Sequence, residues 1–147
     1  MCKIDVDKLI FMYSKSHEPF QMMVSGLSMY PVLNEGDIIT VCRKRDYKIG
    51  DIIVFQYKDN SFLVHRLLKI QNGRFFCKGD HSSRMEDVEK DRIVGYVLID
   101  HDPHKTEDFI IDSIRINRIY HKLGFDVEST KKSAEYKAYQ AKYLNNL

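Results

Sequence analysis

Three short segments carry side chains whose chemistry could work together: a hydroxyl, an imidazole and a set of carboxylates. The first is Ser28, which stands between Gly26 and Pro31, directly after the predicted strand Phe20–Val24. A serine on such a turn presents its hydroxyl at a strand end and keeps its own backbone N–H free to donate a hydrogen bond. This arrangement suits a nucleophile, although an ordinary turn serine has the same sequence pattern.

The second segment contains His65, which alternates with Leu63 and Leu67 in a strongly apolar stretch. Imidazole has an ordinary pKa of about 6.5, so it can accept a proton at neutral pH when its second ring nitrogen is held by an acceptor. A buried histidine can also simply belong to a core. The residue alone therefore allows both interpretations, a general base and a structural histidine.

The third segment supplies carboxylates, first in Lys78-Gly79-Asp80 and then at Glu86 and Asp87. A carboxylate can fix the tautomer of a catalytic imidazole. Asp80 is the first choice because it follows the predicted strand Arg74–Lys78, whose hairpin returns the chain beside His65. Asp80 could instead hold a turn with its own backbone, and the acidic run 86–91 is typical of a solvated face.

Taken in order, these segments resemble the catalytic domain of the S26 signal peptidases, within the superfamily that also contains the LexA-type S24 peptidases. The similarity extends from about Val24 to Ile99. The segments that carry it are Gly26–Pro31, Gly50–Phe55, Val64–Arg66 and Lys78–Asp80. Common bacterial enzymes of the family have a lysine where His65 stands. The histidine is similar to the branch found in the endoplasmic reticulum, in archaea and in sporulating bacteria.

The resemblance implies roles for individual residues. Ser28 matches the nucleophile and His65 the general base, while the orienting acid of the family follows several residues after Asp80, which makes Asp87 the second choice and Glu86 the third. Many relatives place Ser or Thr at the position of Gly26, so backbone N–H groups at Gly26 and Ser28 are expected to form the oxyanion hole. The family also continues its last motif with Asn, where this chain has His81.

The elements that must position these residues divide the chain into three parts. Helical periodicity predicts an N-terminal helix within residues 1–19 and a helical extension over 101–147, with helices near Phe109–Leu123 and Thr130–Leu147. Residues 20–100 predict a mainly β, coiled antiparallel domain. Asn72-Gly73 indicates its clearest hairpin. The predicted strands are Phe20–Val24, Asp37–Cys42, Asp51–Gln56, Phe62–Gln71, Arg74–Lys78 and Ile93–Ile99.

Composition excludes several other classes of protein. The formal net charge is only +2, so the chain lacks the strongly basic character of a dedicated nucleic-acid binder. Its three cysteines have no CxxC spacing, and we expect neither a disulfide framework nor a metal site nor a cofactor. No signal peptide or membrane-spanning segment is predicted, so we expect a cytoplasmic protein.

These observations favour a serine endopeptidase that cleaves a leader-type or signal-type peptide. Its partner is a peptide or protein substrate, with peripheral tethering by a membrane-associated partner as a further option. A second hypothesis is a peptidase-like module that binds a polypeptide without cleaving it. A third is a LexA-type self-cleaving regulator, which is disfavoured because the chain has no Ala-Gly or Cys-Gly site and has His65 at the position of the base.

Overall fold

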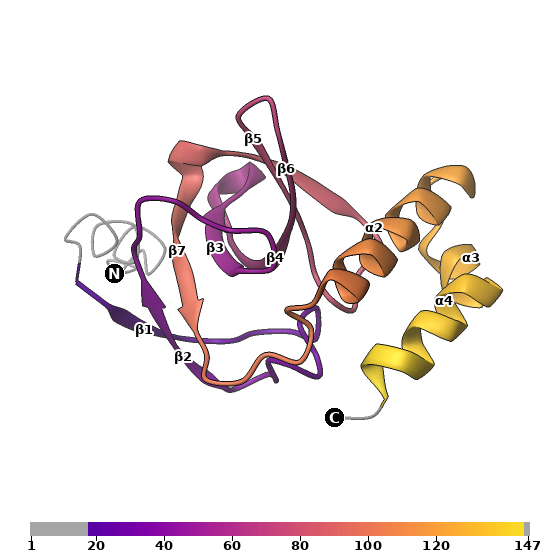
Figure 1. The fold of residues 1–147 in the computed structure, drawn as a ribbon, viewed down its shortest axis with the longest axis horizontal. Coiled ribbons are helices and arrows are strands. Elements are labelled where there is room, and N and C mark those ends of the chain that lie inside the picture. The colour runs from indigo at the N-terminus through magenta and orange to yellow at the C-terminus, as the bar shows by residue number, and fades with distance from the viewer. Residues whose placement is uncertain (1–17, 146–147) are drawn as a thin grey trace, which may run out of the picture.

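The computed structural model describes residues 18–145, and within them seven strands form one antiparallel sheet. The order across the sheet is β1-β2-β7-β3-β4-β5-β6. The strands are β1 (Phe20–Met23), β2 (Ile38–Cys42), β3 (Ile52–Gln56), β4 (Phe62–Gln71), β5 (Arg74–Lys78), β6 (Met85–Glu89) and β7 (Ile93–Leu98). The sheet curls on itself, as Figure 1 shows. The prediction of a mainly β, coiled antiparallel architecture is confirmed.

Both faces of the curled sheet pack against apolar side chains, and strand β3 contributes residues to both. It lies between β4 and β7, and successive residues point to opposite faces. Ile52 and Val54 therefore join one buried apolar cluster, while Ile53 and Phe55 join another. A strand buried on both faces has a continuous apolar sequence rather than an alternating one.

The hairpin between β4 and β5 sets the register of the functional residues. Asn72 and Gly73 adopt φ values of 52° and 73°, which a two-residue hairpin turn of this kind requires. The hairpin was predicted from these two residues, and its strands have the predicted bounds. It pairs Arg66 with Lys78 across the two strands.

Strand β6 was not predicted. Its sequence, Met-Glu-Asp-Val-Glu, is rich in carboxylates and was interpreted as a solvated face, but it pairs with β5 at the edge of the sheet. Glu86 and Val88 are buried, whereas Asp87 and Glu89 are exposed. The alternation of a strand is therefore present, with a buried glutamate on the inner face.

The helical part follows the sheet and gathers at one side of it (Figure 1). It consists of α2 (Glu107–Lys122), α3 (Val127–Lys132), α4 (Ala134–Tyr139) and a short π-helical turn, η3 (Gln140–Leu144). The expected single helix Thr130–Leu147 is wrong, because Ser133 interrupts it and caps α4 by accepting a hydrogen bond from the backbone N–H of Tyr136.

Two single-turn helices, η1 (Lys58–Asn60) and η2 (Lys90–Arg92), connect strands of the sheet. The expected N-terminal helix lies outside the described residues. Within residues 18–145, no helix is long and apolar enough to cross a membrane.

Candidate active site

Ser28 and His65 come together as the sequence predicted. Ser28 lies in the loop between β1 and β2, beside Met29, whose buried side chain anchors the loop in the core. His65 lies on β4, and its Nε2 is 3.1 Å from Ser28 Oγ. At this distance the ring nitrogen can accept the hydroxyl proton directly.

Glu86 completes the group from strand β6. Its carboxylate oxygen Oε1 contacts His65 Nδ1, the ring nitrogen that faces away from Ser28. Glu86 is 1% exposed and His65 is 8% exposed, so water is largely excluded from this contact. A carboxylate at Nδ1 holds that nitrogen in its protonated form and leaves Nε2 free to receive the proton of Ser28. Of the three candidate acids, the third choice is therefore the one that contacts His65.

Asp80, the first choice, pairs with Arg66 instead. Its two carboxylate oxygens accept from Arg66 Nε and Nη2, each at 2.9 Å. The reason is the alternation of β4: His65 and Arg66 are successive residues and face opposite sides of the sheet. Lys78 pairs with Arg66 across the hairpin, so the chain that continues to Asp80 reaches the guanidinium. Burial alone would raise the pKa of Asp80, but the charge and hydrogen bonds of Arg66, with a hydrogen bond from His104, lower it.

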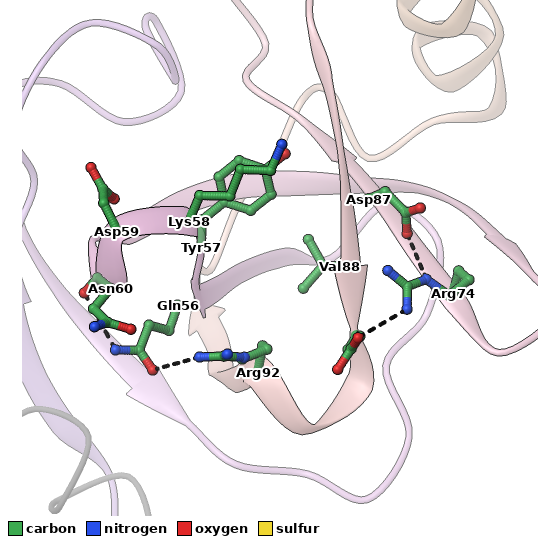
Figure 2. Close-up of a pocket in the computed structure, with 10 residues that line it drawn as sticks. Gln56, Tyr57, Lys58, Asp59, Asn60, Arg74, Asp87, Val88 and Arg92 are labelled. Carbon is green, nitrogen blue, oxygen red and sulfur yellow. Dashed lines mark hydrogen bonds and ion pairs between the residues drawn. The ribbon is translucent and has the colours of Figure 1, made fainter.

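Asp87, the second choice, points away from His65. Figure 2 shows it on β6 with its carboxylate toward Arg74, whose Nε donates to it at 2.8 Å. Because the next residue along a strand changes face, the burial of Glu86 beside His65 places Asp87 in solvent. The geometry thus supports neither Asp80 nor Asp87 as the acid that orients His65.

The loop that contains Ser28 also contacts the chain that follows β5. The backbone N–H of His81 donates to the Ser28 carbonyl at 2.9 Å. Gly79 packs so closely that a Cβ at this position would lie 2.7 Å from the Ser28 carbonyl oxygen. Glycine in the Lys-Gly-Asp motif is therefore required by the approach of the two loops, and any side chain here would displace Ser28.

Backbone donors around Ser28 are unequal. Gly26 has a φ of 83°, which allows the tight turn before the nucleophile, and its N–H points to Glu35 Oε1 at 3.4 Å. Within residues 18–145, the N–H of Ser28 donates no hydrogen bond that would occupy it. Of the two expected oxyanion-hole residues, Ser28 is therefore the one with a donor available.

Lys78 is a buried amine that the sequence did not single out. Its Nζ donates to the carbonyls of Gly79 and Ser82, at 3.0 and 2.5 Å. Burial lowers its pKa to about 7, although the nearby carboxylates of Asp80 and Glu86 oppose that shift. Lys78 therefore stabilises the loop that contains Gly79 and Ser82, which lies beside Ser28.

Side chains of the C-terminal helices also donate hydrogen bonds to this loop, a role that the sequence analysis missed. Three of their side chains donate to successive parts of it. They are Tyr139 to the Asp80 carbonyl at 2.5 Å, Tyr136 to the His81 carbonyl at 3.1 Å and Asn117 to the Ser83 carbonyl at 3.0 Å. The helical periodicity indicated that the tyrosines are buried, but nothing in it indicated which carbonyls their hydroxyl groups would meet.

A pocket of about 320 Å³ lies next to the Ser28–His65–Glu86 group. His65 of β4 and Glu86 of β6 line it together with Tyr120 of α2 and Lys131 of α3. In the part of the chain that the structure describes, no group of three or more His, Cys, Asp or Glu side chains is placed to hold a metal ion.

Sequence comparison agrees with this geometry. Residues 2–98 match the Peptidase S24-like family. The chain belongs to the Peptidase S24-like family. The S24-like match includes Ser28, His65 and Glu86 and ends with strand β7, so α2 and the helices after it lie beyond it. No curated protein matches the chain.

Proposed function

We propose that this chain is a serine endopeptidase in which Ser28 is the nucleophile, His65 the general base and Glu86 the residue that orients His65. The observation that carries the proposal is the continuous contact from Ser28 Oγ to His65 Nε2 and from His65 Nδ1 to Glu86. Membership of the Peptidase S24-like family supports the same chemistry.

In the proposed reaction, His65 Nε2 takes the Ser28 proton while Oγ forms a bond to the carbonyl carbon of the peptide. The oxyanion that develops accepts a hydrogen bond from the Ser28 backbone N–H. The imidazolium, compensated by Glu86, then gives its proton to the leaving amine as the C–N bond breaks. Water, deprotonated by His65, releases the acyl group and restores Ser28.

The use of histidine as the base supports a closer relationship to the S26 signal peptidases with a Ser-His centre than to enzymes with a Ser-Lys centre. On this basis the substrate is a leader-type or signal-type peptide on another polypeptide. The same resemblance implies that the substrate residues just before the cleaved bond have small side chains.

Labelling with a fluorophosphonate tests the proposal, because this probe reacts with an activated serine. Wild-type protein should be labelled once, at Ser28, and the folded Ser28→Ala variant should not be labelled. Intact mass during incubation without substrate should stay constant, since the proposed substrate is another polypeptide. A folded wild-type protein that resists the probe would instead be the peptidase-like binding module, and a loss of mass at a defined internal bond would identify self-cleavage.

A further inference from the structure

The mechanism proposed above uses His65 and Glu86, which line the pocket beside Ser28, but it assigns no occupant to that pocket. Its walls come from two regions of the chain, the β4–β6 side of the sheet and helices α2 and α3. His65 lines this pocket and also contacts Ser28 Oγ, so the pocket lies directly beside the proposed nucleophile. A side chain in it would therefore belong to a residue near the cleaved bond.

Positive charge dominates the walls of this pocket. Arg84 and Lys131 line it and are exposed, and within residues 18–145 neither forms an ion pair. Glu86 is the only acidic residue among those lining it, and its carboxylate is engaged by His65. A lining with two unpaired cations and one compensated carboxylate favours an anionic occupant.

His81 provides a second, independent observation. Its Nδ1 is buried and has no hydrogen-bond partner among the described residues. Burial lowers the pKa of His81, and the charges of Lys131 and Lys78 lower it further, whereas a backbone hydrogen bond with Tyr30 raises it. The ring therefore lies in the positive field of this region. His81 also lines the pocket, so the same positive field acts on an occupant.

The apolar residues that line the pocket suit the methylene part of an acidic side chain. Tyr120 is 8% exposed and presents a fixed ring, and Val127 adds apolar surface at the start of α3. Aspartate and glutamate combine a short methylene stem with a carboxylate that accepts several hydrogen bonds. Their side chains therefore match both the apolar and the charged parts of the lining.

We propose that this pocket binds an acidic side chain of the substrate polypeptide and so determines the sequence that is cleaved. The inference rests on the proposed function, because it assigns the specificity of the same site. Arg84 comes from the family-matched part of the chain and Lys131 from the helices beyond it. The acidic preference thus requires both parts.

Affinity selection tests the inference without the need for turnover. A random library of octapeptides is passed over the immobilised Ser28→Ala protein. The C-terminus of each peptide is amidated, so that its side chains carry its only carboxylates. The second protein adds Arg84→Glu and Lys131→Glu. The matched control instead adds Arg118→Glu and Lys132→Glu, which reverse the same charges on exposed residues outside the pocket and carry the same cost at the end of α3.

We expect Asp and Glu to be enriched about twofold to fivefold by the Ser28→Ala protein and by the control, as one partly exposed ion pair would produce. The protein with both pocket charges reversed should lose this enrichment and favour Lys or Arg. Equal enrichment by all three proteins, or none by the Ser28→Ala protein, would overturn the inference. Fluorophosphonate labelling of the wild type separates the two claims, since labelling without acidic enrichment rejects only the pocket, and acidic enrichment without labelling rejects only the peptidase.

Discussion

His65 and Arg66 are neighbours in the sequence and serve two separate charge systems. His65 faces Ser28 and Glu86, while Arg66 faces Asp80 and Asp102 on the other side of β4. In the proposed mechanism, the histidine takes a proton from Ser28 and later gives it to the leaving amine. The guanidinium is fixed by the hydrogen bonds that it donates to two carboxylates, and these carboxylates raise its pKa, so it stays charged.

Replacement of Glu86 by Gln should slow fluorophosphonate labelling of Ser28 by about 10²–10⁴-fold, because the amide no longer compensates the imidazolium or fixes its tautomer. The rate is measured from pH 5.5 to 8.5, since a change in the pH profile reports on His65 rather than on folding. Asp87→Asn, on the outer face of the same strand, is the control and should keep the wild-type rate. A wild-type profile in Glu86→Gln would remove Glu86 from the mechanism.

Replacement of Asp80 by Asn should destabilise the fold by about 3 kcal/mol, because the buried Arg66 loses one of its two carboxylate partners and keeps only Asp102 as a counter-charge. Urea unfolding measures the change. The surface pair of Arg74 with Asp87 provides the comparison, and its loss should cost about 1 kcal/mol or less. Unchanged stability together with lost labelling would return Asp80 to the orienting role first expected for it.

At the level of elements, the sequence predicted six of the strands closely, because their apolar runs end at clear turn residues such as Asn72 and Gly73. It did not predict β6, since three of the five residues of that strand are acidic. The segment is a strand because it pairs with β5, with Val88 and Glu86 buried on its inner face. Burial of a glutamate requires a partner from another strand. Local sequence patterns contain no information about that partner.

The same limit applies to the candidate site. Ser28 and His65 could be predicted as a pair because both lie in recognisable motifs. The orienting acid could not, since the choice between Asp80 and Glu86 depends on which face of β4 each strand end reaches. The hydrogen bonds from the C-terminal helices were equally hidden, because amphipathic spacing predicts burial but not the partner of a hydroxyl group.

Tyr139 offers a test of the support that these helices give to the loop. Tyr139→Phe removes the hydrogen bond to the Asp80 carbonyl and should cost about 1 kcal/mol of stability. Labelling of Ser28 should also slow several-fold at a temperature where the variant is fully folded, because the loop that contacts the Ser28 carbonyl is less firmly held. Tyr57→Phe, at the residue between β3 and η1 (Figure 2), should leave both quantities unchanged. A wild-type labelling rate in Tyr139→Phe would limit the helices to a structural role.

Across the whole molecule, a buried polar network joins the sheet to the helical part. Asp80 accepts from Arg66 and from His104 Nδ1, and His104 Nε2 lies 2.9 Å from the carbonyl of Tyr143. The His104 ring also stacks on Phe109 of α2, with centroids 4.2 Å apart. Removal of any one member leaves a buried polar partner unsatisfied, so the network favours a single arrangement of sheet and helices.

Lys78 makes the stability of the molecule depend on pH. In the folded protein its pKa is about 7, whereas the ordinary value is 10.5. Between these values the unfolded chain binds one more proton than the folded chain, so the free energy of unfolding rises with pH, by up to about 1.4 kcal/mol per pH unit. Urea unfolding from pH 7 to 8.5 should show this rise in the wild type.

The variant Lys78→Met should lose that rise, while Lys137→Met on the exposed surface of α4 should keep it. The comparison uses slopes, so it holds even though Lys78→Met lowers the stability at every pH. Parallel slopes in wild type and Lys78→Met would show that Lys78 remains charged when buried.

The pocket beside Ser28 has one wall built from Tyr120, Val127 and Lys131, all of which lie beyond the family-matched residues 2–98. This origin matters for inhibitor chemistry. An electrophile aimed at the serine alone reacts with features that many peptidases share. A compound that also extends a carboxylate arm toward Lys131 would draw its discrimination from a wall supplied by α2 and α3, and peptidases without these helices would offer that arm only solvent.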